Sequence, residues 1–199
     1  MKNLVSNVLK PSIFVDHSDI IYFTNDTTVK MLKTDGSLKT VAGNGTSGSA
    51  LNQLKWASGI YVDQKGAVYV SDGGNFRVMK WNSNAKEGII VAGGYGQGMN
   101  ASQLFGVQSL FVDELNNNTL YVCDVYNFRI QKFLKNSLIG ITVLNKNMNS
   151  ILDFPSSIYV DFNDVIYISQ DKGIFRWFQG LQRAEVVLAG HVGNNSDRF

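Results

Sequence analysis

The chain has 199 residues, 44% of them hydrophobic, and 18 Lys and Arg against 16 Asp and Glu give a formal net charge of +2. This length and hydrophobicity exclude a wholly disordered chain and suffice for one large domain, or at most two. The near balance of charge gives no reason to expect a nucleic-acid or membrane partner. The single cysteine, Cys123, excludes an internal disulfide framework.

The sequence does not determine the cellular compartment of the protein. No apolar run approaches the roughly 18–20 residues of a membrane span, and residues 1–10 contain no hydrophobic core of a signal peptide. These absences predict a cytoplasmic protein by default. An extracellular parent protein is the alternative, because five Asn-x-Ser/Thr sequons occur. They begin at Asn25, Asn44, Asn100, Asn117 and Asn194.

In chain order, the first segment with a recognisable motif is rich in glycine. TVAGNGTSGSALNQ (40–53) has the G-x-G-x-x-G spacing of a dinucleotide-binding loop in Gly43, Gly45 and Gly48. Only about ten residues separate Gly48 from the next β-like run, which is too few for the helix that such a loop must open. The stretch also returns as VAGGYGQGMNASQL (91–104). We therefore interpret it as the connector of a repeat, and no cofactor is expected.

Four β-rich units follow one another along the chain. Each opens with a branched apolar residue, an aromatic residue, valine and aspartate, at SIFVD (12–16), GIYVD (59–63), SLFVD (109–113) and SIYVD (157–161). A second run centred on tyrosine follows in each unit, and then a third and a fourth. Four short strands per unit predict a propeller blade. Because both alternating sets of residues are apolar, these strands should be covered on both faces, as in stacked blades.

We thus predict an all-β fold, a β-propeller of four-stranded antiparallel blades, in one segment spanning 1–199. The blades are expected at approximately 11–56, 57–106, 107–154 and 155–199. The first strand of each blade has the most uniform pattern and should line the central channel. The tyrosines of the second strands should occupy equivalent buried positions. They are Tyr22, Tyr69, Tyr121 and Tyr167.

The second and third units carry a resemblance to a known family. YVSDGGNFRVMKW (69–81) and YVCDVYNFRIQKF (121–133) resemble the NHL repeat, in which a strand ending in Asp is followed by Asn-His-Arg and another strand. Phe76 and Phe128 stand in place of the family's histidine. The resemblance covers about residues 11–199 and implies an incomplete or open six-bladed propeller, since the family usually closes six blades; closure at four is the alternative.

The resemblance is weaker in the outer units. In the first, Lys30 is taken to stand at the arginine position. In the fourth, Asp171 and Arg176 match only with a shift of one residue.

Two Asp–Arg pairs recur at identical spacing, Asp72 with Arg77 and Asp124 with Arg129. One hypothesis makes the arginines contacts for anions or RNA. Their recurrence at the same blade position favours a structural role instead, in which each guanidinium is partly buried against its aspartate.

The candidates for metal or acid–base chemistry are few. The chain has two histidines, His17 and His191, too few for the three-histidine zinc site that a likeness to peptide-amidating lyases would imply. The repeated aspartates that end the first runs could form a calcium-binding ring as in lactonase-type propellers. We interpret them as turn caps, and Cys123 as a buried, inert residue. No metal site and no catalytic residue is predicted.

With no catalytic residue predicted, we expect a non-catalytic interaction scaffold, not an enzyme, that binds an unidentified protein partner through its loop face. An RNA-binding NHL propeller is the alternative, and a lactonase- or lyase-like propeller enzyme is the third option. Self-association through open blade edges is a further expectation. Strand direction brings the glycine-rich connectors and the turns after the second strands to one face, where tyrosines beside amides favour recognition. The binding residues expected there are Tyr95, Tyr126, Asn75, Asn127, Gln97 and Asn44.

Overall fold

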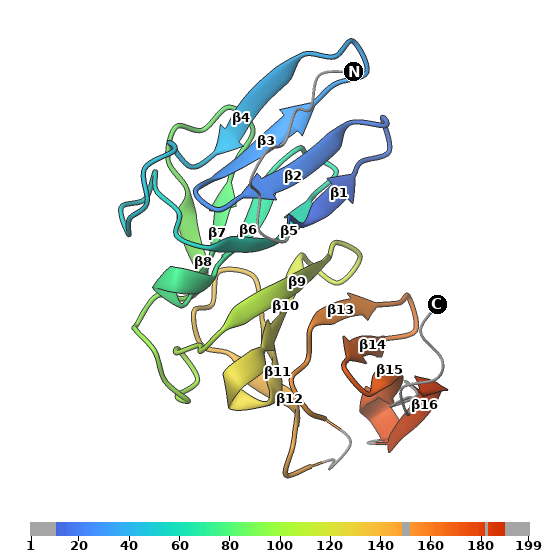
Figure 1. The fold of residues 1–199 in the computed structure, drawn as a ribbon. Helices are drawn as coiled ribbons and strands as arrows, with labels where there is room; N and C mark the ends of the chain where they lie inside the picture. The colour runs from blue at the N-terminus through green and yellow to red at the C-terminus, as the bar shows by residue number, and fades with distance from the viewer. Residues whose placement is uncertain (1–10, 149–151, 182, 190–199) are drawn as a thin grey trace, which may run out of the picture.

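The structure is a computed structural model that describes residues 11–148, 152–181 and 183–189. These residues form four four-stranded antiparallel sheets, each with its strands in chain order. The described residues contain three single-turn 3-10 helices, η1 (Gly73–Asn75), η2 (Val125–Asn127) and η3 (Gln179–Leu181), and no longer helix. The predicted all-β propeller architecture with four-stranded antiparallel blades is confirmed (Figure 1).

The first two sheets come from the N-terminal half of the chain. The first contains β1 (Ile13–Val15), β2 (Ile21–Asn25), β3 (Thr28–Leu32) and β4 (Leu38–Ala42). The second contains β5 (Ala57–Val62), β6 (Val68–Asp72), β7 (Arg77–Trp81) and β8 (Ile89–Gly93).

The other two sheets repeat this plan. The third contains β9 (Val107–Asp113), β10 (Thr119–Asp124), β11 (Arg129–Phe133) and β12 (Ile141–Asn145). The fourth contains β13 (Ser157–Val160), β14 (Val165–Gln170), β15 (Gly173–Phe178) and β16 (Arg183–Ala189).

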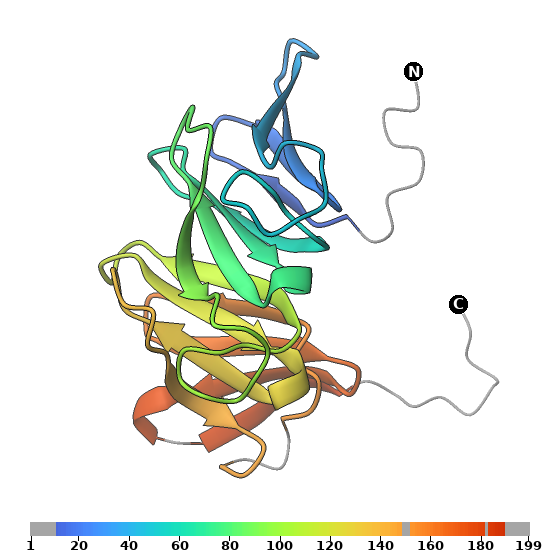
Figure 2. The same ribbon diagram turned by 90° about the vertical axis from the view of Figure 1, so that its left-hand side faces the viewer.

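The four sheets follow one another in an arc, with the first strand of each sheet toward the middle and the last at the periphery (Figure 1). The inner strands contact their neighbours in order, β1 with β5, β5 with β9 and β9 with β13. Figure 2 shows the same succession as a stack, from the blue first sheet to the orange and red fourth sheet. This arrangement directs the inner strands at one central space, as the sequence predicted.

The hydrophobic core consists of three layers, one between each pair of neighbouring sheets. Large side chains at the outer ends of the sheets close these layers, and Trp81, Phe133 and Trp177 are each at most 2% exposed. A middle sheet contributes to two layers because both of its faces are apolar. In β10, for example, Val122 packs toward the second sheet and Cys123 toward the fourth.

The outer faces of the first and fourth sheets differ from the middle ones. Ile13 and Val15 on the first sheet, and Ile174 and Leu188 on the fourth, are all exposed. The expectation that the four repeated tyrosines are buried is met only in part. Three of the four tyrosines, Tyr22, Tyr69 and Tyr121, are buried between sheets. Tyr167 is only partly buried because its face of the fourth sheet is directed away from the third. Self-association through these faces stays a prediction.

The repeated Asp–Arg pair fastens each middle sheet to the connector that precedes it. In the second sheet the Arg77 Nε lies 2.7 Å from Asp72 Oδ2, and the other guanidinium nitrogens donate to the carbonyl oxygens of Ser49, Ala50 and Gln53. Arg129 repeats this arrangement on the third sheet with Asp124 and three connector carbonyls. Both arginines are buried and bonded within the fold, so they are withdrawn from solvent anions.

Burial affects the aspartates of these pairs. It raises the pKa of Asp72 and of Asp124 above the ordinary carboxyl value, against the opposing hydrogen bonds from the asparagine of the same turn, a backbone amide and the arginine. The backbone amide that bonds Asp72 belongs to Lys55, at 2.8 Å. The pair therefore also fixes the chain directly before β5.

The strand register corrects the expected matches in the outer units. The partner of Asn25 across the β2–β3 hairpin is Thr28, so Thr28 and not Lys30 occupies the arginine position of the first sheet. In the fourth sheet that position is Gly173, opposite Gln170, and Arg176 instead pairs with Glu185. The physical reason is the hairpin turn, which has two residues here and four in the middle sheets.

Candidate functional site

The central space is a pocket of about 1310 Å³ bounded by the inner strands β1, β5, β9 and β13. It extends past both ends of these strands, from Asp26 and Trp56 at one end to Asp161 and Phe162 at the other. Its volume exceeds the roughly 300–1,000 Å³ of an ordinary small-molecule site. A pocket at the centre of the arc, reached by every sheet, is the main candidate functional site.

One wall of the pocket is a row of four aromatic rings, which we call the aromatic row. It consists of Phe14, Tyr61, Phe111 and Tyr159, one from each inner strand. Successive ring centroids lie 5.2, 5.6 and 5.1 Å apart, at interplanar angles of 57, 75 and 71°. Such tilted contacts are the favourable arrangement for neighbouring rings. The row arises because each unit places its aromatic residue at the same strand position.

The hydroxyl of Tyr61, the second ring of this row, meets a carboxylate. The Tyr61 hydroxyl donates to Glu114 Oε1 at 3.0 Å, and the backbone amide of Gln64 donates to Glu114 Oε2 at the same distance. Burial, and after it the charge of Glu114, raises the pKa of Tyr61 well above its ordinary value. The phenol is therefore protonated at neutral pH and faces the pocket as a proton donor beside a proton acceptor.

The repeated aspartates bend the chain after each inner strand. Asp16, Asp63 and Asp161 accept backbone hydrogen bonds at 2.8–3.1 Å from residues two and four positions further on, and Asp113 accepts one from Asn116 at 3.0 Å. This geometry is that of turn caps. Among the described residues no three His, Cys, Asp or Glu side chains are grouped as metal ligands would be. Asp113 and Asp161 also border the pocket.

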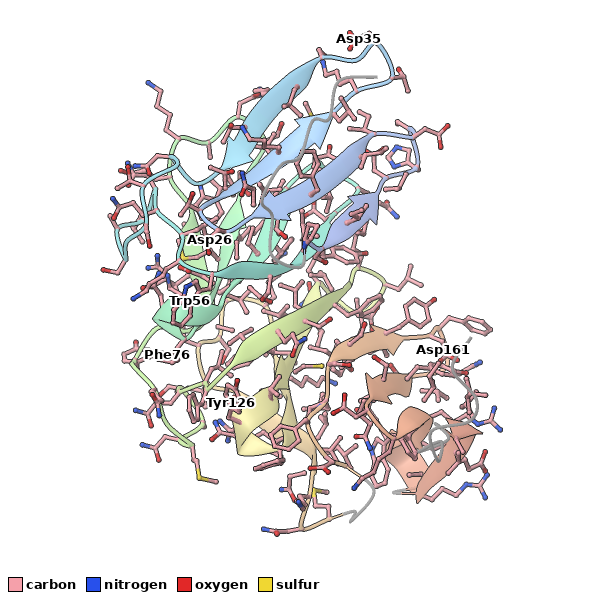
Figure 3. All side chains as sticks on the ribbon, in the orientation of Figure 1. Asp26, Asp35, Trp56, Phe76, Tyr126 and Asp161 are labelled. Carbon is pink, nitrogen blue, oxygen red and sulfur yellow. The ribbon has the colours of Figure 1, made fainter. Side chains whose placement is uncertain are left out.

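The opposite end of the pocket is marked by Trp56. Its side chain is 63% exposed and its φ is +57°, a conformation that is an outlier for a bulky residue. Figure 3 shows Trp56 on the opposite side of the molecule from Asp161, near Phe76 and Tyr126. In the third sheet the equivalent residue is Gly106, whose φ is +79°. The second sheet thus keeps a large aromatic where the turn favours glycine.

The predicted binding residues do not form one free surface. Tyr95 and Tyr126 are exposed as expected. Asn75 and Asn127 instead hold their own turns, because each donates to the aspartate three residues earlier and to a connector carbonyl. Tyr126 packs against Phe105 with a centroid distance of 4.8 Å.

The other two predicted residues lie in the glycine-rich connectors. Asn44 accepts from the Thr46 amide at 2.8 Å, within its own turn, and the carbonyl oxygen of Gln97 accepts from Gln103 Nε2 at 3.5 Å. Both are exposed, but neither lines the central pocket.

The sequence reasoning missed Glu114. The position after each repeated aspartate is held by His17, Gln64, Glu114 and Phe162 in the four units, so comparison of the repeats carries no signal for it. Its proximity to Tyr61 depends on the packing of β9 against β5. Cys123 is fully buried, and burial followed by the charge of Asp124 raises its thiol pKa far above the usual range. Burial and the raised thiol pKa both disfavour the reactive thiolate.

Comparison with solved structures finds the same type of fold at low sequence identity. No protein-family model and no curated protein sequence matches the chain. Among solved structures, a streptogramin B lyase has a TM-score of 0.58 at 15% identity, over 83% of this chain and 50% of the lyase. Virginiamycin B lyase from Staphylococcus aureus has a TM-score of 0.60 at 13% identity, over 92% and 56%.

A third structure is a catalytically inactive histidine-to-alanine variant of the Staphylococcus aureus enzyme with quinupristin. Its TM-score is 0.55 at 16% identity, over 84% of this chain and 52% of the enzyme. The chain therefore spans about half the length of these neighbours. At such identities the likeness shows the propeller fold.

These neighbours correct two expectations. The predictions of a non-catalytic interaction scaffold and of no enzymatic activity are wrong on this comparison, because the neighbours are lyases and match the third option. The scaffold prediction rested on the two histidines being too few for a zinc site and on the repeated aspartates being turn caps. Neither point excludes chemistry by a phenol and a glutamate. Within the described ranges, no helix is long and apolar enough to cross a membrane.

Proposed function

We propose that the chain forms the substrate-binding arc of a propeller enzyme that cleaves an organic substrate by elimination. The observation that carries the proposal is the Tyr61–Glu114 pair, in which a phenol of the aromatic row donates to a carboxylate at 3.0 Å. The likeness to lyases supports the reaction class. We also propose that the units are divergent NHL repeats, supported by the motifs at 69–81 and 121–133.

The pair can perform both proton transfers of an elimination. Glu114 accepts the proton of a substrate carbon–hydrogen bond, whose electron pair becomes a carbon–carbon double bond. The bond from the neighbouring carbon to the leaving-group oxygen breaks, and Tyr61 donates its phenolic proton to that oxygen. The proton on Glu114 then passes to the Tyr61 oxygen along the existing hydrogen bond. The pair returns to its starting state and no water is consumed.

The electrostatics of the pair favour this order. The charge of Glu114 contributes to the raised pKa of Tyr61. When Glu114 takes up the substrate proton that charge disappears, so the phenol becomes a stronger acid as the leaving group requires it. The aromatic row supplies a rigid apolar wall that orients the substrate and excludes water from it.

Mass spectrometry of the products tests the proposal. The 199-residue chain is incubated with streptogramin B compounds, including quinupristin, which is present in one neighbouring structure. Elimination gives products whose combined mass equals that of the substrate, whereas hydrolysis adds one water. Glu114→Gln and Tyr61→Phe should each lower kcat by roughly 10²–10⁴-fold.

A matched control removes a carboxylate elsewhere. Glu87 is exposed and lies outside the pocket, so Glu87→Gln should leave turnover unchanged. The proposal is wrong if the products have gained water, if the unmodified chain cleaves none of these compounds, or if both pocket variants turn over as fast as the control.

A further inference from the structure

The central pocket has a one-sided charge that the chain as a whole does not have. Four acidic residues border it, Asp26, Asp113, Glu114 and Asp161, and no Lys, Arg or His does so in the described part of the chain. The complete sequence, by contrast, carries a formal net charge of +2. A cleft lined by one sign of charge concentrates the opposite charge within it. The lining of the pocket is therefore suited to a positively charged group.

The four carboxylates are not neutralised by protein cations. None of them belongs to an ion pair among residues 11–148, 152–181 and 183–189. Other acidic residues do have such partners, as Asp63 has Lys80 at 3.6 Å and Asp153 has Lys172 at 3.1 Å. The hydrogen bonds that Glu114 and Asp161 accept come from neutral amides and hydroxyls. These bonds leave the negative charge in place.

The aromatic row lies between these charges. Asp26 borders the pocket at the Trp56 end, whereas Asp113, Glu114 and Asp161 follow the inner strands at the other end. An aromatic ring attracts a cation placed over its face. Tyr159, the last ring of the row, is 56% exposed, and Trp56 is 63% exposed. The pocket therefore offers ring faces and carboxylates to the same ligand.

Trp56 shows that a ring at this site already holds an ammonium group. The Lys55 Nζ lies 5.2 Å from the centre of the Trp56 ring. Trp56 adopts a φ of +57°, where the third sheet has Gly106. The bulky ring is thus retained at a strained position at the mouth of the pocket, which points to use of the ring itself.

From these contacts we infer that the pocket binds an organic cation, an amine or quaternary ammonium group carried on an apolar or aromatic body. The cationic group lies over the ring faces and near the carboxylates, and the apolar body packs along the aromatic row. A phosphate-rich ligand such as RNA is repelled by the same lining. The inference rests on the proposed function, and it names the substrate class of the same pocket.

The test compares three probes of similar size by isothermal titration calorimetry with the 199-residue chain. They are benzyltrimethylammonium, neutral benzyl alcohol and anionic phenylacetate. We expect the cation to bind at least about tenfold more tightly than either of the others. Asp161→Asn should weaken cation binding several-fold and leave benzyl alcohol unchanged, because asparagine retains the turn cap. The control Asp35→Asn removes an exposed charge on a distant turn (Figure 3) and should change neither.

Two variants examine the mouth of the pocket. Trp56→Asn, which tolerates positive φ, should preserve the fold and weaken cation binding. Lys55→Met removes the competing ammonium group and should strengthen it. The inference is overturned if phenylacetate or benzyl alcohol binds as tightly as the cation, if none of the three binds, or if Asp161→Asn has no effect. Tight cation binding without turnover would instead contradict only the proposed elimination reaction. Rapid turnover of neutral substrates alone would contradict only the inference that the pocket binds a cation.

Discussion

Replacing Arg77 by lysine measures what the buried guanidinium contributes. The arginine makes four hydrogen bonds, one to Asp72 at 2.7 Å and three to the carbonyl oxygens of Ser49, Ala50 and Gln53 at 2.8, 3.1 and 3.2 Å. A lysine ammonium can keep the ion pair with Asp72, but it cannot reach three carbonyls in a planar fork. Each lost bond to a charged donor is worth roughly 1.5–3 kcal/mol before water replaces part of it. We expect Arg77→Lys to lower the free energy of unfolding by about 2–4 kcal/mol.

Urea unfolding followed by circular dichroism gives this free energy from the midpoint and the slope. Arg129→Lys serves as a replicate, because Arg129 has the same four kinds of partner. Arg183→Lys is the matched control, since Arg183 forms an exposed pair with Glu185 and should cost less than about 1 kcal/mol. If Arg77→Lys and Arg129→Lys cost no more than the control, the connector contacts do not stabilise the fold and the reasoning fails.

Two further predictions concern the pocket and its rim. Because the folded-state pKa of Tyr61 is raised, its contribution to stability is complete below the ordinary tyrosine pKa of about 10 and is lost as pH rises above it. Urea midpoints measured on both sides of pH 10 should therefore fall more steeply for the unmodified chain than for Tyr61→Phe. Equal slopes would contradict this prediction. A Cβ at Gly106 would lie 2.3 Å from Tyr126 Cδ2, so Gly106→Ala should destabilise the fold. The control is Gly96→Ala, because Gly96 has the same φ of +79° but nothing within 4 Å of an added Cβ, and it should cost less. Equal thermal midpoints of the two variants would show that Tyr126 moves away without cost.

The repeat made most of the fold predictable. Strands such as IYVD and VYVSD are apolar on both faces, and only stacked sheets bury both faces of a strand. The Asp–Arg pairs were also visible, since their spacing is identical in the two middle units. The outer units misled the prediction because the two-residue turns of the β2–β3 and β14–β15 hairpins change which residue faces the aspartate position.

The site was less predictable than the fold. Each aromatic of the row was identified as part of a repeated motif, but side-chain periodicity alone does not show that four rings from different strands meet. Glu114 and Tyr61 are 53 residues apart, and their hydrogen bond depends on how two sheets pack. The attention given to the loop face reflected its tyrosines and amides, yet Asn75 and Asn127 there hold backbone turns.

The contacts that Arg77 and Arg129 make with the connectors also bear on how such a chain is synthesised and how its repeats can be duplicated. Arg77 binds residues 49–53, which precede its own sheet, and Arg129 binds residues 99–103 in the same way. During synthesis the connector has therefore left the ribosome before the arginine that fastens it, so each of the two middle units can form these contacts without any later segment. The module that can be copied or transplanted intact is then a connector with the sheet that follows it, 43–93 or 93–145. A cut placed after a connector would separate Arg77 or Arg129 from the carbonyls that it binds.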